Sequence, residues 1–287
     1  MSSGHDDRCV GELYVVATPI GNLEDITLRA LRVLKEADIV AAEDTRVTAR
    51  LLAHHGIERR IVSLHEHNEK AMTDRVLEWL SQGKKVALVT DAGTPAVSDP
   101  GAITVKTVRA AGCRVTPVPG PSALSAALSV SGMCERRVVF CGFLPASQSA
   151  RRKAIAELAR EPGTLVFYEA PHRVLDCVRD LAAGLGGDRE LVVARELTKL
   201  FESVHTCTLG AAAEWLAADE NRTRGEFVLI VSGARHSQEP SDWQAVLAAL
   251  LKELPLAQAV KLTCAATGAK RKAVYDHALE LQKSKAL

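Results

Sequence analysis

Aromatic residues are scarce in this chain of 287 residues, which has five phenylalanines, three tyrosines and three tryptophans. RNA-recognition motifs stack bases on aromatic side chains, so the composition argues against that class of protein. Alanine, valine and leucine are abundant instead, which suits close packing of helices on a parallel sheet. A chain of this length is long enough to form two domains.

The sequence also shows no C-x-x-C pair, no leader pattern at its start and no long apolar run. Its seven cysteines are scattered without a C-x-x-C pair, which indicates neither a disulfide framework nor a zinc site. We therefore expect free thiols, as at Cys113 and Cys141, and no metal, with His65 and His67 as polar surface or cleft residues. The start MSSGHDDRCV has no apolar segment, and no run reaches the roughly 18 residues that span a membrane. These absences predict a soluble cytoplasmic protein without a membrane partner.

The formal net charge is only +1, but residues 241–287 carry seven basic against four acidic residues. Lys270, Arg271 and Lys272 stand at the start of a predicted helix, where cations oppose the helix macrodipole. A phosphate partner would explain them, and so would a solvated face of a packed helical hairpin. Two helical patterns on either side of Gly268 resemble a helix-turn-helix.

Residues 11–131 alternate between strand and helix patterns, which predicts an α/β domain built on a parallel sheet. The expected strands and helices are listed in chain order: strands near 13–17, 38–43, 60–64, 85–90 and 113–118, and helices near 25–36, 45–54, 68–81, 101–111 and 121–131.

Residues 136–233 form a second predicted α/β domain, after a polar stretch at residues 131–137. Two consecutive strands, near 189–195 and 202–208, have no helix between them, which implies a hairpin and a mixed sheet. The other expected elements are strands near 137–142, 163–168 and 225–232 and helices near 149–160, 171–182 and 210–217. A polar linker then leads to a small helical extension, residues 241–287.

The run VALVTDAGTPAVSDPG, residues 86–101, breaks from a buried strand into a long loop rich in Gly, Pro, Asp, Ser and Thr. Such a loop could merely connect two elements, with Ser98 or Asp99 capping the next helix. Two further loops of the same kind follow strands, at residues 18–22 and 117–123. Because the carboxyl ends of parallel strands meet at one sheet edge, the three loops should converge there on a ligand.

Eight ordered motifs resemble the tetrapyrrole methylase superfamily and, more closely, the ribosomal RNA small subunit methyltransferase I family. They are ATPIGNLEDIT (17–27), AAEDTR (41–46), LHEHNE (64–69), VTDAGTPAVSDPG (89–101), PVPGPSA (117–123), FYEAPHR (167–173), ARELTKLFE (194–202) and RGEFVLIV (224–231). The resemblance covers roughly residues 11–232, and the tail is similar to the helical domain appended to this family. It implies a two-domain tetrapyrrole-methylase-like fold.

The resemblance further implies that S-adenosylmethionine lies folded in a cleft between the two α/β domains. Because glycine has no side chain, residues such as Gly93 and Gly120 would let a ligand approach exposed backbone groups closely. Asp91 could accept from a hydroxyl or the ammonium, while Thr94 and Ser98 could donate to the carboxylate. The expected cofactor-binding residues are Pro19, Asp91, Ala92, Gly93, Thr94, Pro95, Ser98, Gly120, Pro121, Ser122 and Ala123.

Glu169 and Lys199 stand at expected strand ends of the second domain, and we predict them as proton acceptor and polariser for methyl transfer. The alternative for each is a structural ion pair, for instance with Arg173 or Arg195. Phosphate contacts are expected from basic residues in both parts of the chain: Arg46, Arg173, Lys270, Arg271 and Lys272.

The resemblance implies that the chain uses S-adenosylmethionine to methylate the ribose 2′-oxygen of the cytidine at position 1402 of 16S rRNA, and that it is a homodimer. A small-molecule tetrapyrrole precursor is an alternative acceptor. It is disfavoured because residues 91–95 read DAGTP, where the wider superfamily often has Gly-Gly-Asp-Pro. A ligand-sensing DNA-binding regulator is the alternative from another class.

Overall fold

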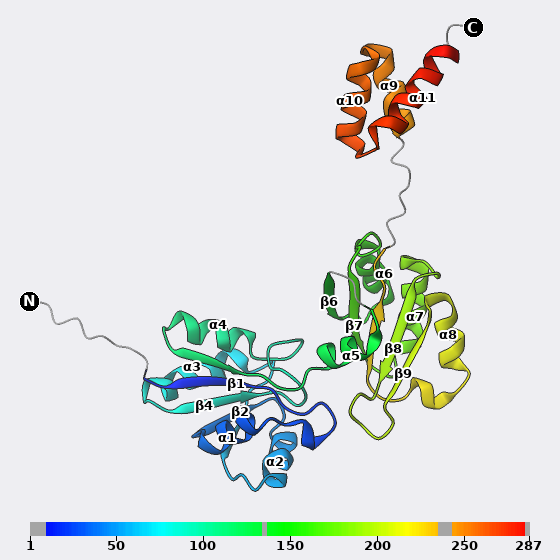
Figure 1. Cartoon of the computed structure of the whole chain (residues 1–287). Coiled ribbons are helices and arrows are strands. Elements are labelled where there is room, and N and C mark those ends of the chain that lie inside the picture. The colour runs from blue at the N-terminus through cyan, green and yellow to red at the C-terminus, as the bar shows by residue number, and fades with distance from the viewer. Residues whose placement is uncertain (1–9, 134–136, 235–242, 285–287) are drawn as a thin grey trace, which may run out of the picture. The chain divides into compact units, whose positions relative to one another are not determined.

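The computed structural model describes residues 10–133, 137–234 and 243–284 of the chain (Figure 1). The chain forms two compact units, Met1–Gly233 and Ala234–Leu287. The expected domain limits at residues 136, 241 and 287 fall outside the described residues. Among the described helices, none combines the length and apolarity needed to cross a membrane.

Five parallel strands form the first sheet of the larger unit, in the order β3-β2-β4-β1-β5. They are β1 (Glu12–Val16), β2 (Ile39–Ala42), β3 (Arg60–Ser63), β4 (Lys85–Val89) and β5 (Arg114–Val118). Strands β2 and β4 read IVAA and KVALV and are almost wholly buried, as strands covered on both faces must be. The prediction of a parallel α/β sheet is confirmed.

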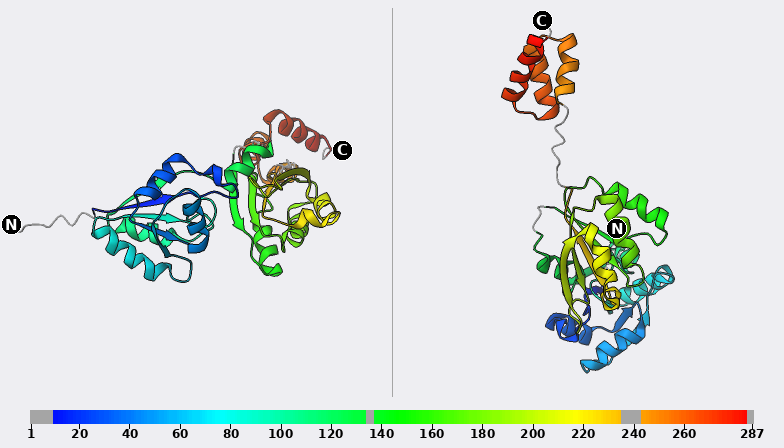
Figure 2. Two further views of the ribbon diagram at one scale, coloured as in Figure 1. Left: turned by 90° about the horizontal axis from the view of Figure 1, so that it is seen from below. Right: turned by 90° about the vertical axis from the view of Figure 1, so that its right-hand side faces the viewer.

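Helices cover both faces of this sheet (Figure 2). Leu34 and Leu52 pack on one face and Leu80 and Val108 on the other. Side-chain caps fix two helix starts, because Thr27 accepts from Ala30 N and Asp44 accepts from Arg46 N. The elements are α1 (Leu28–Glu36), α2 (Thr45–His54), α3 (Glu69–Ser81), α4 (Ala102–Ala110) and the short 3₁₀ helix η1 (Leu23–Asp25).

The second sheet is mixed, in the order β6-β7-β10-β8-β9. Only β6 and β7 pair in parallel, and β8 and β9 form the predicted hairpin. The strands are β6 (Val138–Phe143), β7 (Thr164–Glu169), β8 (Glu190–Arg195), β9 (Ser203–Thr208) and β10 (Phe227–Val231). One face packs against α6 (Gln148–Glu157), α7 (Val174–Leu185) and α8 (Leu209–Ala217), and η2 (Glu220–Thr223) precedes β10.

Helix α5 (Ala123–Ser131) covers the other face of this second sheet. Its Ala127 is buried against Val192 and Ile230. The sequence pattern grouped this helix with the first sheet, because an apolar stripe shows that a helix is covered but not what covers it. The chain therefore passes from the first sheet to the second before α5, and not at the polar stretch after it.

The described residues of the smaller unit, 243–284, form three helices, α9 (Trp243–Glu253), α10 (Leu256–Thr267) and α11 (Arg271–Ser284). They share a core that includes Leu247, Val260 and Val274. Gly268 ends α10 in the left-handed conformation, with φ of 70°, which glycine adopts readily. The two helices predicted on either side of Gly268 are confirmed, and α9 adds a third.

The cysteines in the described part of the chain divide into two groups. Cys141, Cys177, Cys207 and Cys264 are free, and burial raises the pKa of the Cys141 thiol to about 11, so this thiol is unreactive at neutral pH. Cys113 is disulfide-bonded, so the prediction of a free thiol there is wrong. Sequence spacing does not reveal a pair that only folding brings together.

Candidate active site

Three loops meet at the carboxyl edge of the parallel sheet, as predicted. Strand β1 lies between β4 and β5, so the loops after these strands are neighbours. The loop at residues 91–101, hereafter the central loop, bonds to the loop after β1 through Thr18 N to Gly93 O at 2.9 Å and Gly93 N to Thr18 O at 3.1 Å. Thr94 Oγ1 donates to Pro121 O at 3.4 Å in the loop after β5. These bonds join the three loops into one wall.

The end of β2 adds carboxylates to this wall. Asp91 Oδ1 accepts from Asp44 N at 2.9 Å, and Glu43 Oε2 accepts from Thr90 Oγ1 at 2.7 Å. Burial, reinforced by the carboxylate of Glu43, raises the pKa of Asp99 to about 6. Burial also raises the pKa of Asp91. Three carboxyl groups thus crowd one side of the site, and a bound cation would relieve their repulsion.

Glu69 holds the far end of the central loop. Its buried carboxylate oxygen Oε1 accepts from Gly101 N at 3.1 Å and from Thr104 N at 3.0 Å. Helix α4 begins here without a cap from its own N-cap residue, Gly101. The carboxylate of Glu69, which is distant in sequence, therefore accepts hydrogen bonds from N–H groups at the start of α4. Negative charge is favourable at that end of a helix. This explains the last residue of the LHEHNE motif.

A second loop, residues 196–202 between β8 and β9, lies across the cavity from the central loop; we call it the lysine loop. Both loops carry backbone that L-residues rarely adopt. Every non-glycine residue with positive φ in the described part of the chain lies in one of them: Ala96, Ser98, Glu196 and Thr198. Such conformations persist where the surroundings hold them, and they cluster at functional sites.

Lys199 is held between two carboxylates. Its Nζ lies 2.9 Å from Glu196 Oε1 and 2.8 Å from Glu226 Oε2. Burial alone would lower the pKa of Lys199, but the hydrogen bonds to Glu226 and Glu196 outweigh it and raise that pKa. A Cβ on Gly21 would lie 2.4 Å from Lys199 Cγ, so this glycine makes room for the stem. Lys199 is therefore a fixed cation, which excludes it as the proton acceptor.

Glu169 is fully buried and ion-paired. Its Oε1 lies 3.2 Å from Arg173 Nε, and Arg173 Nη2 donates to Leu144 O at 2.6 Å and to Pro145 O at 3.2 Å. The structural ion pair with Arg173 is therefore what the structure shows. This pair fastens the end of β7 to the end of β6, and it commits Arg173 to carbonyl groups of the protein instead of leaving it open to phosphate.

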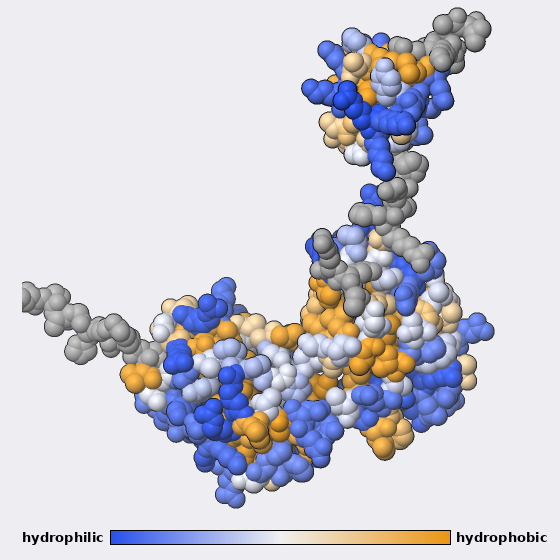
Figure 3. Space-filling view, in the orientation of Figure 1, coloured by the Kyte–Doolittle hydropathy of each residue, from blue (hydrophilic) through white to orange (hydrophobic). Residues whose placement is uncertain are grey.

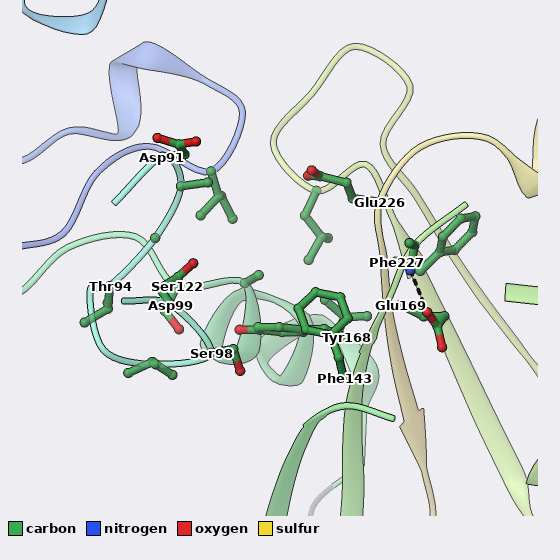
Figure 4. A pocket seen from close by; sticks show the side chains of 18 of the residues that line it. Asp91, Thr94, Ser98, Asp99, Ser122, Phe143, Tyr168, Glu169, Glu226 and Phe227 are labelled. Atoms are coloured by element: carbon green, nitrogen blue, oxygen red, sulfur yellow. Dashed lines mark hydrogen bonds between the residues drawn. The ribbon is translucent and has the colours of Figure 1, made fainter. Parts of the chain in front are cut away.

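A cavity of about 380 Å³ lies between the two loops, within the usual size of small-ligand sites. Figure 4 shows Asp91, Thr94, Ser98 and Asp99 on one side and Phe143, Tyr168 and Glu226 on the other. The predicted residues that line it are Asp91, Ala92, Gly93, Thr94, Ser98, Ser122, Ala123, Glu169 and Lys199. Four predicted residues belong to the same loops but are not in the lining: Pro19, Pro95, Gly120 and Pro121.

Sequence reasoning missed several lining residues. Glu43, Tyr168 and Glu226 lie inside the quoted motifs and could have been found there, and Asp99 was considered only as a helix cap. No sequence pattern points to Phe143 as a site residue, because it lies in an ordinary strand pattern outside every motif.

The expected phosphate-binding residues belong to both units, Arg46 and Arg173 to the larger one and the other three to the smaller one. Arg46 is 84% exposed and pairs with Asp44 at 2.6 Å, next to the carboxylate wall. Lys270, Arg271 and Lys272 are exposed in the smaller unit, the latter two in the first turn of α11. Among the described residues, no group of three or more His, Cys, Asp and Glu side chains could hold a metal ion.

The donor set of the cavity fits S-adenosylmethionine. Its sulfonium and ammonium are cations, which suit a wall bearing Glu43, Asp91 and Asp99. Ser98 of the strained central loop lines the cavity, and its hydroxyl can donate to a carboxylate. Buried Ala194 and Val228 give an apolar surface for a flat ring.

Comparison with known proteins agrees with this geometry. The profile of the Tetrapyrrole (Corrin/Porphyrin) Methylases matches residues 12–213, and that of the RsmI C-terminal HTH domain matches residues 237–282. The solved cobalt precorrin-4 methyltransferase covers 77% of this chain and 94% of its own, with a TM-score of 0.58 and 20% identity. A Thermus thermophilus uroporphyrin-III C-methyltransferase complexed with S-adenosyl homocysteine covers 77% and 97%, with a TM-score of 0.55 and 23% identity. These likenesses confirm the predicted fold.

Two curated relatives are closer. Ribosomal RNA small subunit methyltransferase I of Xylella fastidiosa Temecula1 is 52% identical over 92% of this chain and 98% of its own length. The protein of that name from Escherichia coli O157:H7 is 49% identical over 96% and 97%. The chain therefore belongs to the ribosomal RNA small subunit methyltransferase I family, within the tetrapyrrole methylases, and S-adenosylmethionine is its cofactor.

Proposed function

We propose that this chain methylates the ribose 2′-oxygen of the cytidine at position 1402 of 16S rRNA. One observation carries the proposal: the chain is about half identical, over nearly its whole length and both of its units, to proteins named ribosomal RNA small subunit methyltransferase I. The corrin and porphyrin enzymes share only the fold, at 20–23% identity. A tetrapyrrole acceptor is therefore not favoured.

The cofactor would be held by the central loop and its two neighbours. Asp91 and Asp99 face the cationic groups, and Thr94 and Ser98 present hydroxyls to the carboxylate. Gly93 gives the backbone a close approach, with φ of 87°. When bound, S-adenosylmethionine would supply the methyl group of its sulfonium for an in-line displacement, with the neutral thioether as the leaving group.

Lys199 would act on the acceptor. Its ammonium, kept charged by two carboxylates, stabilises negative charge that develops on the 2′-oxygen as the methyl group is transferred. Glu226, 73% exposed and 2.8 Å from Lys199 Nζ, receives the hydroxyl proton and passes it to water. Buried Glu169 positions the end of β7 through Arg173. This assignment keeps Lys199 as polariser and proposes Glu226, instead of Glu169 or Lys199, as the proton acceptor.

RNA would be held by charges in both units. Arg46 lies beside Asp91 at the carboxylate wall, and the basic start of α11 offers Lys270, Arg271 and Lys272. Replacing the last three with Glu should weaken RNA binding and flatten its dependence on salt, because fewer phosphate contacts release fewer counterions. Calorimetry with S-adenosylmethionine should show unchanged cofactor affinity. An unchanged salt slope for RNA would remove these residues from the interface.

The function is tested with radiolabelled S-adenosylmethionine and small ribosomal subunits that lack the methyl group. We expect label in 16S rRNA, recovered as 2′-O-methylcytidine after nuclease digestion and mass spectrometry. Label that enters only a tetrapyrrole would contradict the proposal. So would tight binding of duplex DNA without any methyl transfer.

We also propose that the chain acts in the cytoplasm as a homodimer. Strand β9 is a sheet edge, and Leu200 and Phe201, just before it, are 89% and 67% exposed. Figure 3 shows an apolar projection where Figure 1 has the β8–β9 connection. Exposed apolar side chains beside a sheet edge are normally covered by a partner. Light scattering of the purified protein should give twice the mass of one chain.

A further inference from the structure

Three aromatic residues gather beside the cavity in a chain that has few of them. Phe140 and Phe143 lie on β6 and Tyr168 on the adjacent β7. The Tyr168 ring centroid lies 4.9 Å from that of Phe140 and 5.7 Å from that of Phe143, each at 67°, which is favourable edge-to-face geometry. The Tyr168 hydroxyl accepts from Leu124 N at 3.0 Å. Tyr168 is thus a fixed support, held by Phe140 and by the start of α5.

An irregularity in β6 aims Phe143 at this support. The pairing register with β7 shifts between Phe140 and Gly142, and Gly142 has φ of 63°. In a regular strand Phe143 would share a face with Cys141, which packs toward the core on the opposite face from Phe140. The extra residue instead brings Phe143 to the Tyr168 side. Bulges next to active sites commonly redirect one side chain in this way.

The redirected ring is open on one side. Phe143 is 54% exposed and lines the cavity, and Figure 4 shows it against Tyr168, with Ser98 and Asp99 across from the pair. An exposed Phe ring with an aromatic support behind it offers a stacking surface for another flat ring. Apart from its contact with Tyr168, Phe143 belongs to neither of the two core clusters described for the second sheet.

We propose that Phe143 is the stacking platform for the base of the nucleotide that receives the methyl group. This rests on the proposed function, which brings two flat rings to the site: the adenine of the cofactor and the acceptor base. The cofactor is free to enter the enclosed part of the cavity, beside buried Ala194 and Val228. A nucleotide within a strand is tethered on both sides and reaches only the rim. Stacking there compensates for the loss of neighbours when the base leaves its own stack.

The test replaces Phe143 with Ala, Leu or Trp and measures methyl transfer to unmethylated small subunits, together with cofactor affinity by calorimetry. Phe143→Ala and Phe143→Leu should raise the KM for subunits about tenfold or more, because the ring contact is lost. Phe143→Trp keeps an aromatic ring and should therefore have a KM for subunits close to that of the wild type. The affinity for S-adenosylmethionine should stay constant throughout. Val138→Ala, an exposed change on the same strand, is the matched control.

Three results overturn the proposal. An unchanged KM for Phe143→Ala shows that no base stacks there, and full activity of Phe143→Leu shows that bulk suffices. Weaker cofactor binding with an unchanged KM for subunits assigns the ring to adenine. A wild-type chain that transfers nothing to small subunits overturns the proposed function itself, so the two failures are distinguishable.

Discussion

The central loop and the lysine loop face one cavity, yet they are fixed by different means. The central loop is held by backbone groups: Gly93 pairs with Thr18, and Gly101 donates to the distant Glu69. The lysine loop also has backbone bonds, such as Glu196 N to Glu226 O at 2.9 Å, but it adds an ion pair network, with Lys199 between Glu196 and Glu226. Both loops contain strained non-glycine residues. The strain of the lysine loop is therefore supported by charge in addition to backbone bonds.

This difference fits two tasks. A loop of backbone groups and carboxylates makes a shaped, negative wall for a small cationic ligand. A lysine locked between carboxylates keeps one positive charge in one place, ready where negative charge develops. We therefore expect changes in the central loop to affect cofactor binding and changes in the lysine loop to affect turnover.

The largest effect should come from Lys199→Ala. Removing a group that stabilises developing charge lowers kcat by about 10²–10³, while cofactor affinity should change less than about twofold, since the central loop is intact. Single-turnover kinetics and calorimetry measure the two quantities. Lys106→Ala, an exposed lysine on α4, is the control. A loss of cofactor affinity equal to the loss of rate would contradict the division between the loops.

Glu69→Ala should show the reverse pattern. It leaves the buried N–H groups of Gly101 and Thr104 without their acceptor, which costs about 1–3 kcal/mol of unfolding free energy. The end of the central loop is released, so cofactor affinity should fall more than kcat. Glu69→Gln retains an acceptor oxygen and should recover most of the loss, and exposed Glu66→Ala should change neither quantity. Stability close to wild type in Glu69→Ala would show that water replaces the carboxylate.

The two loops also differ in how far sequence could predict them. The central loop is predictable because Gly93, Pro95 and Pro100 break an apolar strand pattern, and sequence shows such local breaks directly. The lysine loop, ELTKLFE, has no glycine or proline. Lys199 was found only through the resemblance of its motif, and its charge state depends on Glu226, which is distant in sequence. Local patterns do not contain that information.

The same limit explains the remaining differences. The strands and helices of both sheets follow the predicted order, because apolar periodicity reports local conformation. The packing of α5 on the second sheet, the register shift at Gly142 and the commitment of Arg173 to carbonyl groups all depend on contacts between elements. Glu169 and Arg173, four residues apart, are the exception. Their spacing made an ion pair foreseeable.

Gly21→Ala tests how firmly the lysine loop must be placed. The added methyl group would lie 2.4 Å from Lys199 Cγ, so the lysine must move. A displacement of this size should lower kcat about tenfold or more without a matching loss of cofactor affinity. Gly187→Ala, where the nearest atom is at an ordinary 3.5 Å, is the matched control. Normal turnover in Gly21→Ala would mean that the position of Lys199 is not critical.

The smallest effect should come from Asp99→Asn, which probes the negative wall through pH. The pKa of Asp99 is raised to about 6, so the wild-type carboxylate is charged at pH 8 and increasingly neutral below pH 6. The affinity for S-adenosylmethionine should therefore decrease as the pH is lowered. Asp99→Asn should bind the cofactor about threefold more weakly at pH 8, and its affinity should depend less on pH.

The raised pKa of Asp99 also predicts an effect on stability. A carboxyl pKa that is higher in the folded than in the unfolded state lowers stability as pH rises from about 4 to about 6. Asp99→Asn should consequently raise the Tm at pH 8 and leave it unchanged below pH 4. Equal pH profiles for wild type and variant would assign the dependence to Asp91, whose carboxyl group shares the wall and also has a raised pKa.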